Sequence, residues 1–91
     1  MDYELIGRHT VAAEAFKAAL RERGMAASQL ARMLRPVAEG SAQGWPAVDL
    51  DAQAMLEMAA AVSRQHDLLL QAQETANALA AQVGAAPLAL R

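Results

Sequence analysis

The chain has 91 residues, 55% of them apolar but only 3% aromatic, and a net charge of −2 at pH 7. Most apolar residues are alanine, leucine, methionine or valine, which suit close helix packing, so one all-α domain over residues 1–91 is predicted. The absence of cysteine excludes disulfides, thiolate zinc sites and cysteine nucleophiles.

The first predicted helix spans about residues 3–23. Ile6, Ala13, Phe16 and Leu20 recur at intervals of three, four or seven, with charged residues between them, which is the period of a helix with one buried stripe. Gly24 follows a basic last turn and is the predicted stop.

A second, short helix is predicted over about residues 27–35. Its apolar face would carry Leu30, Met33, Leu34 and Val37. Pro36 has no backbone donor and disfavours helical geometry in the residue before it, so the helix is expected to fray or bend there.

Residues 40–48, GSAQGWPAV, are predicted to form a loop, because two glycines, a serine and a proline fall among nine positions. The loop contains Trp45, the one tryptophan of the chain. Two interpretations stay open for its ring. It closes the end of the core as a lid, or it stands out and anchors a partner, since tryptophan is common among interface hot spots.

A long helix is predicted over residues 51–83, with Asp51 as its N-cap and Asp49 as the alternative. Gly84 and Pro87 would end it, which leaves residues 84–91 as a tail. A seven-residue repeat within it indicates coiled-coil or helical-hairpin packing, since eight of its nine seam positions are apolar. The seam positions are Met55, Val62, Leu69, Ala76 and Val83 on one side, and Met58, Gln65, Ala72 and Leu79 on the other.

No arrangement of residues indicates catalysis. His9 and His66 are the only imidazoles, and no carboxylate lies three or four residues from His66 to complete a metal pair on a helix. No serine lies in a nucleophile motif, and the loop glycines form no phosphate-binding loop. We therefore expect no enzyme, no cofactor and no metal site.

The segment LRERGMAASQLARML, residues 20–34, carries a basic helix end, a glycine, and a Leu-Ala pair six residues further on. It resembles the first two helices of Cro/C1-type helix-turn-helix proteins, and MLEMAAAV further on is similar to the fourth helix of that family. The resemblance implies a small dimeric DNA-binding regulator with a C-terminal dimerisation helix. Its phosphate contacts would be Arg21, Arg23, Arg32 and Arg35.

The interpretation we favour is a small helical bundle or hairpin in which the N-terminal helices fold back on the long C-terminal helix. That helix would be about 50 Å long, too long for two shorter helices to cover, so its remaining apolar seam would form an interface. The expected function is that of a non-catalytic adaptor, inhibitor or chaperone-like module that binds another protein by helix packing and forms a homodimer. The expected partner or self-association residues are Trp45, Met55, Met58, Val62, Leu69, Leu79 and Val83.

We expect neither a secretory signal nor a membrane span in this sequence. MDYELIGRHT lacks a basic start followed by an apolar run, and no stretch approaches the roughly 18 consecutive apolar residues of a span. We expect a cytoplasmic protein with no membrane partner. Charge is uneven, because residues 1–38 carry six basic and four acidic side chains, whereas residues 39–91 carry two and six.

Overall fold

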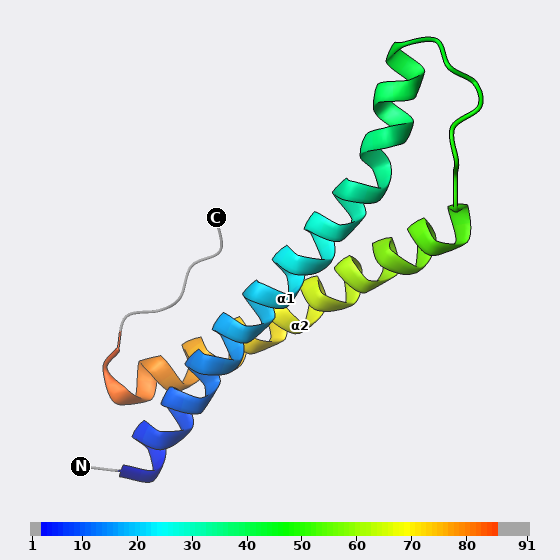
Figure 1. Cartoon of the computed structure of the whole chain (residues 1–91). Coiled ribbons are helices and arrows are strands. Elements are labelled where there is room, and N and C mark those ends of the chain that lie inside the picture. Colours follow the sequence, from blue (N-terminus) through cyan, green and yellow to red (C-terminus); the bar gives the residue numbers. More distant parts are fainter. Residues whose placement is uncertain (1–2, 86–91) are drawn as a thin grey trace.

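The computed structural model describes residues 3–85, which form two helices joined by one loop. Helix α1 spans Tyr3–Ala42 and helix α2 spans Ala52–Val83. The two helices run antiparallel and cross each other, while their ends at the loop stand apart (Figure 1). The prediction of an all-α helical hairpin is confirmed.

Helix α1 is continuous where the sequence predicted a break, so the separate helices 3–23 and 27–35 were wrong. Gly24 keeps a helical backbone, since the positive φ angles in the described part of the chain are at other glycines. A glycine inside a helix costs only about 1 kcal/mol of stability relative to alanine. Packing of the α1 residues before and after Gly24 offsets this cost. Pro36 also lies inside α1. Figure 1 shows α1 changing direction in its teal-to-green part, as expected where proline removes a backbone hydrogen bond.

The actual end of α1 is a Schellman motif centred on Gly44. Gly44 adopts the left-handed conformation, with φ of 75°. The amide of Trp45 donates to the carbonyl of Gly40 at 2.8 Å, and the amide of Gly44 donates to the carbonyl of Ser41 at 3.1 Å. The connection between the helices therefore covers residues 43–51 rather than the predicted 40–48.

The loop returns over the end of α1 and covers Gly40, which is buried. A Cβ atom at this position would overlap the side chain of Val48. Glycine is therefore required here by a close approach between helix and loop, and not by its backbone angles.

Both ends of α2 match the sequence prediction. Asp51 is the N-cap, and its Oδ1 accepts the backbone N–H of Ala54 at 2.9 Å. Gly84 ends the helix in the left-handed conformation, with φ of 73°, and the amide of Ala85 donates to the carbonyl of Ala80 at 3.0 Å. The rest of the predicted tail, residues 86–91, lies outside the described residues.

The seven-residue repeat of α2 packs against a matching repeat on α1. All nine predicted seam positions of α2 are buried or half-buried. The α1 positions that are buried or half-buried at the same spacing are Leu5, Ala12, Ala19, Ala26 and Met33, together with His9, Phe16, Arg23, Leu30 and Val37. The stripe predicted for the first helix was right in part. Phe16 is buried on this seam and Ala13 is half-buried, whereas Ile6 and Leu20 flank the seam and are exposed.

The resulting core is thin. Among the described residues Leu69 is the one large side chain that is fully buried, and the other buried apolar side chains are Ala12, Phe16, Ala76 and Ala80. The molecule measures 65 × 21 × 13 Å, and its radius of gyration is 18.8 Å, against about 12 Å for a compact domain of this length. Two helices side by side leave most of each helix surface in contact with water.

Candidate protein-binding groove

An open apolar groove runs between the two helices along one side of the hairpin. Its central part has a volume of about 500 Å³. A second hollow of about 690 Å³ continues it toward the N-terminal end of α1 and shares Ala12, Ala15 and Thr75 with it. We call the two together the interhelical groove. Its lining comprises Gly7, Arg8, Val11, Ala12, Ala15, Ala18, Ala19 and Glu22 of α1, and Gln65, Leu68, Gln71, Ala72, Thr75 and Leu79 of α2.

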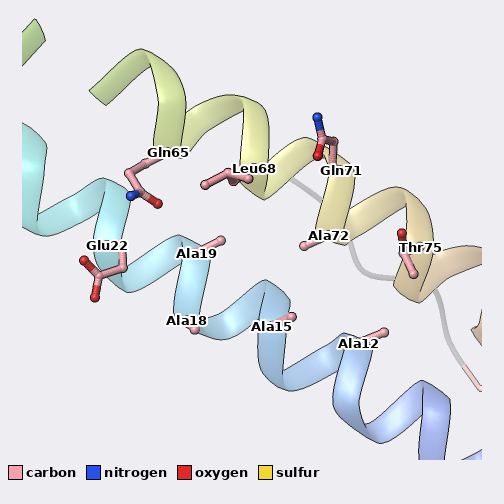
Figure 2. A pocket seen from close by; sticks show the side chains of 10 residues that line it. All are labelled: Ala12, Ala15, Ala18, Ala19, Glu22, Gln65, Leu68, Gln71, Ala72 and Thr75. Carbon is pink, nitrogen blue, oxygen red and sulfur yellow. The ribbon is translucent and has the colours of Figure 1, made fainter. Parts of the chain in front are cut away.

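The groove exists because the facing side chains are small. In Figure 2, Ala19 of α1 and Ala72 of α2 lie on the facing sides of the two helices, and neither reaches far across the gap. Alanine carries only a methyl group, so adjacent turns of α1 at Ala12, Ala15 and Ala19 form a low floor. The helices are held together along the seam, but the space beside the seam stays unfilled.

Larger apolar side chains lie at the edges of this alanine floor and are exposed. Val11 of α1 is 71% exposed and Leu68 of α2 is 51% exposed. The lining contains two charged residues, Arg8 and Glu22, and both belong to α1. Apolar surface of this kind in contact with water favours association with another apolar surface.

A polar contact crosses the seam at one end of the groove. Arg23 Nη1 lies 3.2 Å from His66 Nδ1. Because a guanidinium only donates, Arg23 is the donor and Nδ1 the acceptor in this hydrogen bond. Gln65, next to His66, and Glu22, next to Arg23, line the groove at the same level. Arg23 and Gln65 are polar positions within the mainly apolar seam, and they favour one alignment of the two helices.

Arg23 is a structural residue that the sequence analysis placed elsewhere, among phosphate contacts. Its seven-residue spacing from Phe16 and Leu30 is the signal that identifies its position on the seam, but the predicted break at Gly24 concealed that spacing. The other three candidates, Arg21, Arg32 and Arg35, are exposed on α1. Arg21 and Arg32 line a shallow depression on its surface.

The segment that resembles a helix-turn-helix lies entirely within α1. No turn separates residues 20–24 from residues 27–34, and residues 36–42 continue the same helix. The two-helix local structure implied by the resemblance was therefore wrong, because α1 packs against α2 as one continuous element.

The partner-binding residues predicted on α2 belong to the packing within the hairpin. Leu69 is fully buried, and the others are half-buried. These half-buried residues are Met55, Met58, Val62, Leu79 and Val83. Of the six, Leu79 also lines the interhelical groove.

Trp45 is 64% exposed in the loop. Its ring therefore does not close the core, and the lid interpretation was wrong. Its backbone amide, and not its ring, completes the end of α1.

Neither α1 nor α2 combines the length and the apolar character needed to cross a membrane. Comparisons of the chain with protein-family models, with curated proteins and with solved structures found no match.

Proposed function

We propose that this chain is a non-catalytic protein-interaction module that binds a partner helix in the interhelical groove. The observation that carries the proposal is the groove itself, an alanine floor with exposed apolar side chains beside it. A helix that lays its apolar face into such a groove is a recurring mode of protein recognition. An adaptor, an inhibitor and a chaperone-like protein all act in this way.

The amount of exposed surface supports the proposal. The chain exposes 6592 Å², whereas a globular monomer of its mass exposes about 5,100 Å². The difference, about 1,500 Å², approaches twice the roughly 800 Å² that each partner buries in a protein complex of standard size. The two helices therefore leave more surface uncovered than an ordinary globular monomer does, and the groove is part of that surface.

The lining also defines the partner. Alanines at Ala12, Ala15 and Ala19 permit close approach of a helix backbone, so the partner has large apolar side chains spaced three, four or seven residues apart that fill the floor. Glu22 favours a basic residue at the matching position of the partner, whereas Arg8 is already paired with Glu4 at 2.7 Å.

The proposal is tested by site-specific photocrosslinking in the cells that produce the protein. A photoreactive phenylalanine analogue replaces Ala15 or Leu68 in the groove, and in the matched controls it replaces Ala31 or Leu56, which are exposed and outside the groove lining. We expect a discrete crosslinked product from the two groove positions and none from the controls. The absence of any product from the groove positions, or the same product from the control positions, would refute it.

A further inference from the structure

We infer that the occupant of the interhelical groove is a second copy of this chain, with α1 of one copy lying against α2 of the other. The inference rests on the proposed function and names the partner of the same groove. Two hairpins joined in this way form a four-helix bundle, in which each helix has neighbours on two sides.

The groove face is self-complementary, as a two-fold symmetric interface requires. It carries a low floor of alanines and, on the same face, the protruding side chains of Leu68 and Val11. Leu68 stands on α2, whereas the floor at Ala15 belongs to α1. When α2 of one copy lies over α1 of the other, each leucine meets an alanine floor, and the contact occurs twice.

The exposed area agrees with such a dimer. Each chain exposes about 1,500 Å² more than a compact monomer of its mass, and a stable interface of standard size buries about 800 Å² on each partner. Two hairpins packed along the groove would cover part of that excess, including Val11 and Leu68, which are exposed in the monomer.

The two helices carry opposite net charges, which favours contact between α1 of one copy and α2 of the other. Helix α1 carries six basic and four acidic side chains, a net charge of +2, and α2 carries one basic and three acidic side chains, a net charge of −2. Contact between α1 and the α2 of a second copy brings opposite net charges together, whereas contact between two α1 helices brings like charges together.

The first test measures mass by sedimentation equilibrium from about 1 to 500 μM. We expect the intact chain to have twice its mass of 9.6 kDa. Ala15→Glu places a carboxylate on the alanine floor, where the apolar side chain of Leu68 from the second copy would bury it without a partner, and is expected to weaken dimerisation about 100-fold. The matched control is Ala31→Glu, the same change at an exposed position of α1 outside the groove, which should dimerise like the unmodified chain.

Far-UV circular dichroism checks folding in both variants. Ala15 is exposed in the hairpin, so Ala15→Glu should keep its helix content. The inference is overturned when the unmodified chain stays monomeric at every concentration. It is also overturned when both variants dimerise equally well. A monomer that still forms a crosslinked product with a different protein at Ala15 refutes the second copy while the proposed function stands.

The arrangement of the dimer is tested by disulfide trapping, since the chain has no cysteine of its own. Ala15→Cys and Leu68→Cys chains are prepared separately, mixed and oxidised. A mixed disulfide is expected, because a disulfide requires Cα atoms about 4.4–6.8 Å apart. A predominant Ala15→Cys homodimer places α1 against α1 and overturns the proposed arrangement.

Discussion

Three consecutive leucines of α2 provide a sharp test of the hairpin packing. Leu69 is fully buried, while Leu68 is 51% and Leu70 is 40% exposed. We expect Leu69→Ala to destabilise the fold far more than the same change at either neighbour. The three variants share the same helix turn and the same helix propensity change, so their differences report packing alone.

The size of the effect follows from burial. Leu→Ala removes three side-chain carbons, and each fully buried carbon contributes about 0.8 kcal/mol, so the transfer term for Leu69 is about 2.4 kcal/mol. The cavity left between two helices adds to this, which brings the expected loss to about 3 kcal/mol. The exposed neighbours retain partial contact with water and leave no closed cavity, so Leu70→Ala and Leu68→Ala should each cost less than about 1.5 kcal/mol.

The measurement is urea denaturation followed by circular dichroism at 222 nm. All variants are compared at one low protein concentration, because association shifts the apparent stability by mass action. Equal m-values across the series show that the midpoint shifts report stability. Free energies of unfolding for Leu69→Ala and Leu70→Ala that agree within about 0.5 kcal/mol would refute the packing described above.

Three further predictions concern the ends and the interior of the helices, and all are checked by the same denaturation assay. Gly24→Ala should stabilise the protein by about 0.5–1 kcal/mol, since a Cβ at this position meets open space. Gly40→Ala should destabilise it by about 1–2 kcal/mol, because the side chain of Val48 packed on Gly40 must move. Equal effects of the two substitutions would contradict the close contact between Gly40 and Val48. Asp51→Ala should cost about 1 kcal/mol through loss of the N-cap, and Asp49→Ala, which caps nothing, should cost less than half of that. Pro36→Ala should raise stability by about 1–3 kcal/mol by restoring a backbone donor inside α1, and a lower stability would show that the bend is needed for packing.

The small size of alanine accounts for two features of the hairpin. Alanines in the seam let the two helices pack closely, and alanines beside the seam leave the interhelical groove open. At Ala76, a seam position, the small side chain is fully buried. At Ala15 the same side chain is exposed, because it lies beside the seam and not on it. The interhelical groove is therefore a consequence of how the hairpin is built.

Helix α2 could be predicted from the sequence because its signals are local. Asp51 bonds an amide three residues away, and Gly84 ends the helix through bonds within one turn. The seven-residue repeat from Met55 depends only on helix geometry, so the buried side of α2 follows from spacing alone.

Helix α1 shows what only the tertiary structure decided. Gly24 and Pro36 both disfavour a helix locally, but packing against α2 outweighs these local costs of about 1 and 3 kcal/mol. The side of α1 that faces α2 was decided in the same way, since the helix pairing turns Arg23 inward and leaves Leu20 flanking the seam. The sequence pattern alone predicts a helix when the start signals, stop signals and apolar spacing agree, as they do in α2. In α1 these signals conflict, and contact with α2 decides both how long α1 is and which of its sides is buried.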